Sequence, residues 1–332
     1  MRILVTGGLG FIGSHTVVEL LKTGHDVHIV DNCTNSNTEA LLRIKDITGK
    51  VPGYDYVDIR DLPALRYIAK NLNKIDAIIH FAALKSVSES MNEPYKYYTN
   101  NVTGTLNVLA ILKECNVSTL IFSSSATVYG EPETLPITEQ EPIKPASSVY
   151  GTTKQVCERM IQDYQREYQF TGWLLRYFNP VGAHPTGLLG EAPSGVPNNL
   201  FPYITQTAVG IREQLTVYGK DYETSDGTCM RDFIHVVDLA KAHVATLTSP
   251  VKSKTKIVNV GTGRGHTVQE VIDAFQHVNK LKLNYKYAER RPGDVPITYC
   301  DAAHAQEVLS WCTEMTLTDM VRDAWNYQQR LS

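Results

Sequence analysis

The sequence predicts an α/β fold of the Rossmann type, a doubly wound parallel sheet with a smaller mixed α/β lobe toward the C-terminus. Short β-branched runs alternate with longer amphipathic stretches from the first residue onward, which is typical of strand–helix–strand units. A glycine-rich turn follows the first of these runs. The 332 residues exceed the roughly 250 to 300 at which one core usually stops growing, so two lobes are expected.

The strands of the parallel sheet are predicted where apolar residues run almost continuously, because such strands are buried on both faces. They cover residues 3–6, 27–31, 56–59, 77–82, 120–124 and 173–177. Helices are predicted between them from the spacing of apolar residues, over residues 14–22, 61–71, 101–114 and 150–168. The first helix is expected to end at Gly24, because glycine is the usual residue just past a helix C-terminus.

The sequence changes character after Pro180, where Gly and Pro cluster as far as Pro197 and indicate a loop that leaves the first lobe. The first lobe is therefore assigned residues 1–180 and the second lobe residues 181–332. The second is predicted to contain a strand over residues 215–218 and helices over residues 198–209, 237–247, 268–278 and 317–329. A strand over residues 256–260 is a candidate for returning to the first sheet, which would give segments near residues 234–262 to the first lobe.

Composition excludes several classes of partner and site. The 32 Lys and Arg residues nearly balance the 35 Asp and Glu residues, so no electrostatic footprint for nucleic acid or an anionic membrane is expected. The lack of a CxxC pair argues against a disulfide framework or a zinc site, and no metal is expected. No long apolar run or signal peptide is recognisable, so the expected compartment is the cytoplasm. The cysteines are scattered, at Cys33, Cys115, Cys157, Cys229, Cys300 and Cys312.

The glycine-rich turn predicts a dinucleotide site, because a helix is expected to start directly after it. Gly7 permits the tight turn, Gly10 lets backbone N–H groups approach a pyrophosphate, and Gly13 allows the helix to pack closely on the sheet. The N-terminus of the helix adds about half a positive charge.

Asp31 at the end of the second predicted strand favours NAD over NADP. Its carboxylate can accept hydrogen bonds from both adenosine ribose hydroxyls and would repel a 2′-phosphate. Residues 32–38 contain no Arg or Lys to neutralise that phosphate. Asp58 and Ile59 are candidates for contact with adenine, and the alternative for Asp58 is a solvated loop carboxylate. The segment 81–83 is expected to let the cofactor backbone pass.

Tyr150 and Lys154 form the candidate catalytic pair, since their spacing at the start of a helix places both on one face. A tyrosine titrates near ~10, but the neighbouring ammonium and a positive nicotinamide would favour its phenolate. Tyr150 would then take a proton from a substrate hydroxyl while the carbon gives up hydride. Ser125 closes the fifth strand at the carboxyl edge of the sheet and can bond the same hydroxyl.

These motifs, in this order, resemble the extended short-chain dehydrogenase/reductase family. Within the family the chain resembles the UDP-hexose 4-epimerases over essentially its whole length, and the second lobe carries the most specific strings. Those strings are residues 175–184, 196–200, 227–235 and 290–294.

The resemblance implies a set of binding residues on each side of the reacting sugar. NAD would be held by the glycines of the turn and by Phe11, Ile12, Asp31, Asn32, Cys33, Thr34, Asn35, Ser36, Asp58, Ile59, Phe81, Ala82, Ala83, Leu84, Lys85, Asn100, Ser125, Tyr150, Lys154 and Phe178. The UDP-sugar would be held by Ser125, Tyr150, Asn179, Asn199, Leu200, Leu215, Tyr218, Arg231, Arg291 and Asp294. Arg231 and Arg291 suit a diphosphate because a guanidinium is a planar fork of donors, and Tyr218 can stack on uracil.

The implied reaction interconverts UDP-glucose and UDP-galactose. Tyr150 removes the 4-OH proton as C4 passes hydride to NAD, and the resulting 4-keto sugar rotates and takes hydride back on its other face. Thr298 stands where some of these enzymes carry the much larger Tyr. We therefore expect room for a 2-acetamido group, and with it activity on UDP-GlcNAc and UDP-GalNAc.

Two alternatives share the predicted fold. A nucleotide-sugar 4,6-dehydratase uses the same pair but needs an acid to expel the 6-OH, and the residues after Ser125 are Ala126 and Thr127. A non-catalytic NAD-binding regulator would not need both Tyr150 and Lys154. A homodimer is the expected assembly, as the commonest for such chains.

Overall fold

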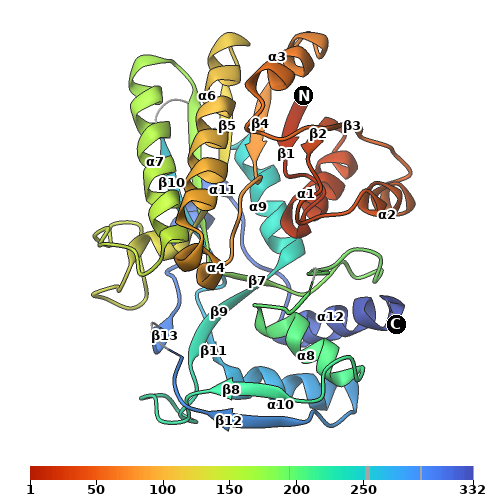
Figure 1. Cartoon of the computed structure of the whole chain (residues 1–332), viewed down its shortest axis with the longest axis vertical. Coiled ribbons are helices and arrows are strands. Elements are labelled where there is room, and N and C mark those ends of the chain that lie inside the picture. Colours follow the sequence, from red (N-terminus) through yellow and green to blue (C-terminus); the bar gives the residue numbers. More distant parts are fainter. Residues whose placement is uncertain (194, 251–254, 292–293, 332) are drawn as a thin grey trace.

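A computed structural model describes residues 1–193, 195–250, 255–291 and 294–331. Within these residues the largest sheet has seven strands in the order β10-β6-β5-β4-β1-β2-β3, all paired in parallel (Figure 1). The order reverses beside β1, and in doubly wound sheets ligands bind at the carboxyl edge there. The strands are β1 (Arg2–Thr6), β2 (Asp26–Asp31), β3 (Gly53–Tyr56), β4 (Ala77–His80), β5 (Thr119–Ser125), β6 (Thr171–Tyr177) and β10 (Lys256–Val260).

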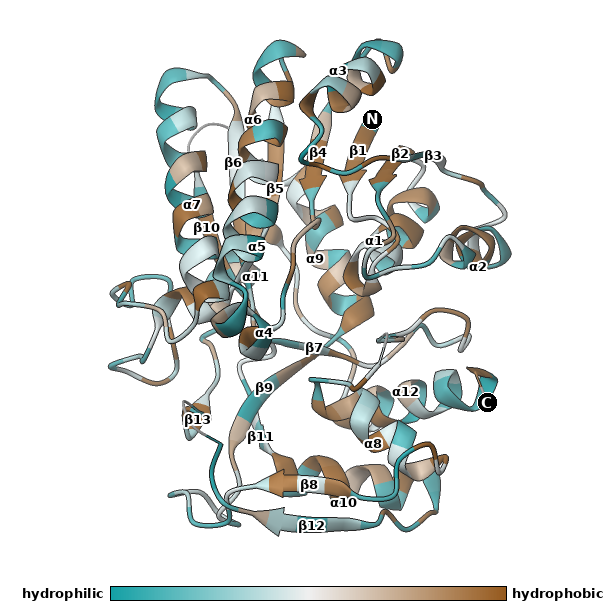
Figure 2. Cartoon of the chain, in the orientation of Figure 1, coloured by the Kyte–Doolittle hydropathy of each residue, from teal (hydrophilic) through white to brown (hydrophobic). Residues whose placement is uncertain are grey.

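Helices cover both faces of this sheet. One face carries α1 (Phe11–Lys22), α2 (Glu39–Thr48), α9 (Val236–Thr248) and α11 (Ala303–Leu309), and the other carries α3 (Leu62–Asn71), α6 (Gly104–Glu114) and α7 (Val149–Glu167). Along β1, Ile3 and Val5 belong to the first core and Leu4 to the second. This alternation explains the near-continuous apolar runs in the sequence. Figure 2 accordingly shows β1 and β4 as hydrophobic, while the outer turns of α6 and α7 are hydrophilic.

A π-helical segment precedes α6, where the sequence predicted an ordinary helix from residue 101. The chain passes through α4 (Val87–Asn92), α5 (Pro94–Tyr97) and the π-helix η1 (Tyr98–Thr103). Asn101 explains the departure: its side chain accepts from the Leu84 amide (2.8 Å) and donates to the Leu84 carbonyl (3.0 Å). The wider turn thus anchors α6 to the loop after β4, which suits the frequent occurrence of such turns at functional sites.

The smaller lobe packs around a third core below the sheet in Figure 1. Its helices are α8 (Leu200–Ala208), α10 (Val268–Asn279) and α12 (Leu317–Leu331). Among the described residues, β7 (Asn179–Val181), β9 (Met230–His235), β11 (Gly265–Thr267) and β13 (Ile297–Thr298) form one small sheet, and β8 (Leu215–Tyr218) pairs with β12 (Tyr285–Ala288). Within the described part of the chain, every helix is too short or too polar to cross a bilayer.

Most predicted elements are present, and the errors lie at their boundaries. The strand predicted over residues 56–59 is displaced, because β3 covers Gly53–Tyr56 and the Asp58 carbonyl then accepts from the Asp61 amide in the turn into α3. The strand predicted over residues 77–82 ends at His80, since the amides of Phe81 and Ala82 both donate to Thr6.

Two further differences concern helices. α1 begins at Phe11 rather than residue 14, because the turn itself supplies its N-cap, Gly10. The helix predicted in the second lobe over residues 237–247 is α9, and it packs in the same core as α1, on the large sheet. The strand predicted over residues 256–260 is β10, which pairs with β6 at the edge of that sheet.

Candidate active site

A cleft of about 1820 Å³ opens at the carboxyl edge of the large sheet and is lined from both lobes. Asp31 and Ser125 contribute from ends of sheet strands, Tyr150 and Lys154 from the start of α7, and Arg231 from the small lobe. Pockets for one small ligand usually measure about 300 to 1,000 Å³. The cleft therefore has room for two ligands of nucleotide size.

The glycine turn leaves space for a pyrophosphate. The atoms that a Cβ would meet at each glycine show where that space lies. A Cβ atom on Gly7 would lie 2.6 Å from the Ala82 nitrogen, and one on Gly13 would lie 2.2 Å from the Gly7 oxygen. A Cβ on Gly10 would meet only the Gly7 oxygen, at 3.4 Å. Gly7 and Gly13 thus permit close backbone packing, whereas Gly10 leaves the N-terminus of α1 open to the cleft, where helix amides favour an anion.

Asp31 is held in place by its own loop. The Leu9 amide donates to Oδ2 (3.0 Å), and the Cys33 amide (2.9 Å) and Ser36 hydroxyl (2.8 Å) donate to Oδ1. A carboxylate has about four acceptor positions, so it keeps room for a ribose hydroxyl. Arg43 of α2 also lines the cleft, and the sequence analysis did not predict this residue. Its guanidinium pairs with the Glu39 carboxylate at 2.5 Å.

Tyr150 and Lys154 lie on successive turns of α7, as their spacing predicted, and both line the cleft with Ser125. Ser148 caps the helix by accepting from the Gly151 amide at 3.1 Å. The Ser125 side chain is close enough to the Tyr150 hydroxyl to lower its pKa. These residues therefore stand together at the end of β5.

The combined effect of Lys154 and a bound nicotinamide on Tyr150 stays a prediction, and the protein alone shows only where Lys154 lies. The Lys154 ammonium donates to the Ser123 carbonyl at 2.6 Å and lies 5.9 Å from the centre of the Tyr150 ring. Burial raises the pKa of the Tyr150 hydroxyl to about 12, although the nearby Ser125 side chain has a smaller, lowering effect on that pKa. Burial also lowers the pKa of Lys154 to about 8. Further positive charge from a bound cofactor is needed to favour the phenolate.

A buried ion pair fixes α7 behind these residues. Arg176 of β6 makes two hydrogen bonds to Glu158 of α7, at 2.9 and 2.7 Å, and both side chains are almost fully buried. The Ser124 hydroxyl donates to the same carboxylate at 2.5 Å. Glu158 follows Lys154 by one helical turn, and Arg176 interrupts an apolar strand. Those two signals could have revealed the pair in the sequence.

The small lobe contributes polar side chains to the far part of the cleft. The Arg231 guanidinium lies 3.8 Å from the Asp294 carboxylate and also donates to the Met230 carbonyl at 2.8 Å. Asn179 of β7 and Thr298 of β13 line the same cleft. The predicted NAD residues line it as well, with the exception of Asp58.

Asp58 and several substrate-side residues lie outside the lining. Asp58 reaches the cleft only through Asn32, whose amide donates to it at 2.9 Å, and its hydrogen bonds with Arg60 lower its pKa to about 2. Leu215 is buried in the core of the small lobe, so only its backbone could meet a ligand, and Leu200 is partly buried against the same core.

Tyr218 and Arg291 also lie outside the lining, but next to each other. The Arg291 guanidinium lies 4.5 Å from the centre of the Tyr218 ring. In the string 290–294, Pro292 and Gly293 fall outside the described residues.

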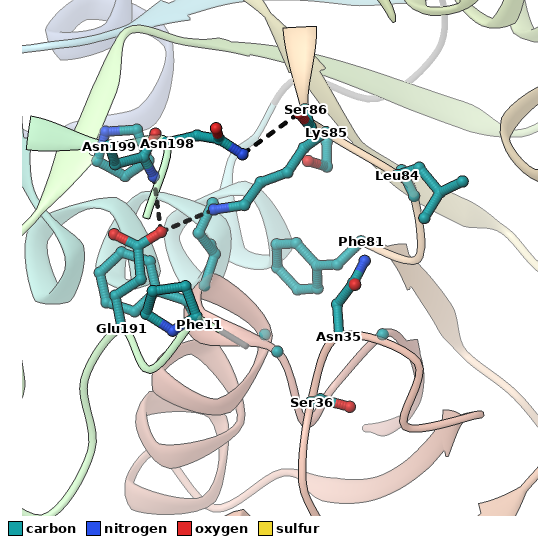
Figure 3. A pocket seen from close by; sticks show the side chains of 18 of the residues that line it. Phe11, Asn35, Ser36, Phe81, Leu84, Lys85, Ser86, Glu191, Asn198 and Asn199 are labelled. Atoms are coloured by element: carbon teal, nitrogen blue, oxygen red, sulfur yellow. Dashed lines mark hydrogen bonds and ion pairs between the residues drawn. The ribbon is translucent and has the colours of Figure 1, made fainter. Parts of the chain in front are cut away.

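Polar contacts that sequence reasoning missed join the two sides of the cleft (Figure 3). Glu191 accepts from Lys85 (2.9 Å) and from Asn199 (2.6 Å), and the Asn198 amide donates to the Ser86 hydroxyl (3.3 Å). Lys85 and Asn199 were predicted as ligand-binding residues, and each stands in one of these contacts.

Comparison with known proteins gives the family. Residues 3–261 match the NAD dependent epimerase/dehydratase family. UDP-glucose 4-epimerase of Bacillus subtilis (strain 168) is 48% identical over 99% of this chain and 97% of its own length. The enzyme of the same name from Dictyostelium discoideum is 48% identical over 98% and 95%.

Solved structures agree over the whole chain. The UDP-glucose 4-epimerase of Bifidobacterium longum in complex with NAD⁺ and UDP has a TM-score of 0.96, with 47% identity over 99% of this chain and 98% of its own. The enzyme of Stenotrophomonas maltophila with NAD and formylated UDP-arabinopyranose has a TM-score of 0.97, with 43% identity over 100% and 98%. The chain therefore belongs to the NAD dependent epimerase/dehydratase family.

Proposed function

We propose that this chain acts as a UDP-glucose 4-epimerase, an isomerase that interconverts UDP-glucose and UDP-galactose with bound NAD. The observation that carries the proposal is the position of Tyr150 and Ser125, where the glycine-turn side of the cleft meets the polar residues of the small lobe. Identity of 48% to epimerases along nearly the full chain supports it.

The cofactor would be held by the glycine turn, Asp31, residues 32–36 and 81–85, Asn100 and Phe178. The open N-terminus of α1 suits the pyrophosphate and the preformed Asp31 carboxylate suits the ribose. When bound, NAD accepts the hydride from the sugar and returns it. Because it ends each turnover unchanged, none has to be added for catalysis.

The chain's own groups move the proton. The Tyr150 oxygen would take the 4-OH proton from the sugar, and the nearby Ser125 hydroxyl would donate to the same region. Lys154 would keep a positive charge one helical turn from Tyr150, with its ammonium donating to the Ser123 carbonyl. Hydride would then return to the other face of C4 while Tyr150 returns the proton to the O4 oxygen, which completes the inversion provided that the sugar ring can turn over.

The nucleotide would serve as the fixed handle in the small lobe. Arg231 offers a planar fork for the diphosphate, and Asn179 and Asn199 offer amides. Arg291 lies against Tyr218 outside the lining and would have to turn toward the cleft to join them. This assignment divides the chain into a NAD-binding domain of residues 1–180, with returning segments near 234–262, and a UDP-sugar-binding domain in the rest of 181–332. Both β10 and α9 support the returning segments, because they pack on the large sheet.

Thr298 supports a broader substrate range. Its side chain lines the cleft from β13, directly beside Arg231 on the paired strand. A threonine leaves more space than a tyrosine would, and we extend the proposal to UDP-GlcNAc and UDP-GalNAc on this ground.

The dehydratase alternative lacks its acid. Ser125 is followed by Ala126 and Thr127, and neither side chain has a carboxyl group that could protonate a leaving hydroxide. The Thr127 hydroxyl donates to the Ser125 hydroxyl at 3.0 Å. A regulator without catalysis would leave Tyr150 and Lys154, which both line the cleft, unexplained.

An exposed apolar stripe supports a homodimer. Tyr95, Tyr98 and Leu106 recur three or eight residues apart on the continuous helical segment that ends in α6, and they are exposed by 84%, 40% and 44%. Large exposed apolar side chains on one side of a helix are typical of an interface. The cytoplasm remains the compartment we propose.

Turnover of UDP-galactose by the purified protein without added NAD tests the function. We expect UDP-glucose as the product with no accumulation of NADH. A 4-keto-6-deoxy product would establish the dehydratase, and absence of turnover despite bound NAD would favour the regulator.

A further inference from the structure

Glu191 joins two residues that the proposed function assigns to different ligands. It lies in the loop between β7 and α8, and its side chain is only 11% exposed. Its Oε1 atom accepts both from Lys85 Nζ at 2.9 Å and from Asn199 Nδ2 at 2.6 Å (Figure 3). Lys85 belongs to the cofactor side and Asn199 to the nucleotide side. A single carboxylate oxygen thus connects the two.

The neighbouring residues repeat this link. Asn198 precedes Asn199 and donates to the Ser86 hydroxyl at 3.3 Å, and Ser86 follows Lys85. Ser86 is itself fixed as the N-cap of α4. Two adjacent residues of one loop therefore contact two consecutive positions of the other loop, one of them through Glu191.

Asn199 shows what the link does locally. It is the N-cap residue of α8, yet its side chain makes no capping hydrogen bond. Asparagine at this position normally accepts from an amide of the first turn. Here its amide group donates to Glu191, which leaves the first amides of α8 without that cap, beside the cleft. Without Glu191 the side chain would be free to turn back and cap α8.

Stability alone does not account for the arrangement. The Lys85 side chain is 56% exposed, and ion pairs with such exposed partners contribute little to folding. Glu191, in contrast, is sheltered, and a sheltered carboxylate needs its hydrogen-bond donors. The contact therefore constrains geometry more than it stabilises the fold.

We propose that Glu191 is a positioning residue for the sugar nucleotide. It sets Asn199 relative to Lys85, so the nucleotide side of the cleft is aligned with the cofactor side before the substrate binds. This inference rests on the proposed function, because that function assigns Asn199 to the UDP-sugar and Lys85 to NAD.

Glu191→Ala and Glu191→Gln test the role in the NAD-loaded protein, with UDP titrated by calorimetry. The alanine variant loses both contacts, and we expect UDP affinity to fall about tenfold, as for a hydrogen bond to a charged group. The glutamine variant keeps an oxygen that can accept from Asn199, so its loss should be smaller. In epimerase assays KM should rise with little change in kcat, since ground-state binding is what is lost.

Lys85→Met in both backgrounds tests the coupling, because contacting residues give non-additive effects. The effect of Glu191→Ala on UDP affinity should be smaller once Lys85 is gone. Glu114→Gln, in the exposed Arg66 pair outside the cleft, is the matched control and should leave UDP affinity unchanged.

Two results would overturn the positioning role: UDP affinity within about twofold of wild type in Glu191→Ala, or a fall in kcat at constant KM. Failure of the wild-type protein itself to bind UDP would overturn the proposed function, and the inference with it.

Discussion

Tyr150 stands in surroundings that oppose its proposed role until the cofactor is bound. Burial raises the pKa of its hydroxyl to about 12, and the Lys154 ammonium is turned toward Ser123. A base in this state is inactive at neutral pH. The ionisation of Tyr150 is thereby tied to the positive nicotinamide, which would arrive next to it, so proton removal and hydride transfer depend on the same ligand.

Tyr150→Phe isolates the hydroxyl, because it keeps the ring and its packing. We expect the rate of epimerisation to fall on the order of a hundredfold or more, as for loss of a general base. NAD content and UDP affinity should stay near wild type. A coupled assay for UDP-glucose and calorimetry with UDP measure the two quantities, and near-normal turnover would refute Tyr150 as the base.

Lys154 predicts an alkaline limit to activity. Burial lowers its pKa to about 8, so the side chain is cationic below that pH and loses its charge as the pH rises through it. The rate should fall over the same range, with an apparent pKa that belongs to the coupled Tyr150–Lys154 pair. Lys154→Arg keeps its charge throughout. A pH–rate profile of Lys154→Arg should therefore lack the decline in rate at alkaline pH. An identical decline in both proteins would contradict the assignment of the alkaline limit to Lys154.

Thr298 predicts which sugars are accepted. Thr298→Tyr should reduce turnover of UDP-GalNAc and UDP-GlcNAc while retaining most activity on UDP-galactose, because the added ring would fill the space for the 2-acetamido group. Rates on both pairs of substrates, followed by product analysis, measure the ratio. Equal turnover of the N-acetyl sugars in both proteins would show that Thr298 does not set the size of the pocket.

Residues in local motifs could be predicted from the sequence, and residues defined by distant partners could not. Asp31 ends a strand and Tyr150 precedes Lys154 by one helical turn. A few neighbouring residues are therefore enough to predict their roles. Glu191 meets Lys85 across 106 positions of the chain. No local pattern distinguishes such a carboxylate from a solvated one.

At the scale of elements, the position of α7 is fixed by charge as well as by packing. The Glu158–Arg176 pair lies between α7 and β6 with almost no solvent contact. Removing one partner of a buried pair leaves the other charge without compensation, which is far costlier than losing an exposed pair. The pair therefore holds the helix that carries Tyr150 and Lys154.

Glu158→Gln should destabilise the protein by about 3 to 5 kcal/mol, since Arg176 stays buried and charged. Glu114→Gln breaks the exposed pair with Arg66 and should change stability by about 0.5 kcal/mol or less. Urea unfolding of both variants measures the difference. Equal shifts would mean that the buried pair does not hold α7.

Element types could be predicted from periodicity, whereas ends and neighbours required tertiary contacts. β3 lies three residues before its predicted position, and a turn between Asp58 and Asp61 occupies the predicted residues. The helix before α6 widens because the Asn101 amide binds the backbone of Leu84. In each case one polar group bonds to a position that the apolar pattern does not encode.

At the scale of the molecule, the two faces of the large sheet differ in what they leave exposed. α1, α2, α9 and α11 pack on one face, and α3, α6 and α7 pack on the other. The stripe of Tyr95, Tyr98 and Leu106 lies on the second of these faces. A second copy that presents the same stripe would bury it by twofold symmetry.

Leu106→Glu tests this homodimer. A charge placed in an apolar interface loses its water without gaining a partner, which is costly. We expect the wild type to sediment at twice the 37.1 kDa of the chain and the variant to sediment as a monomer. Leu42→Glu is the matched control, because Leu42 is also exposed but lies on α2, which covers the opposite face of the sheet. Loss of the dimer in both variants, or in neither, would place the interface elsewhere.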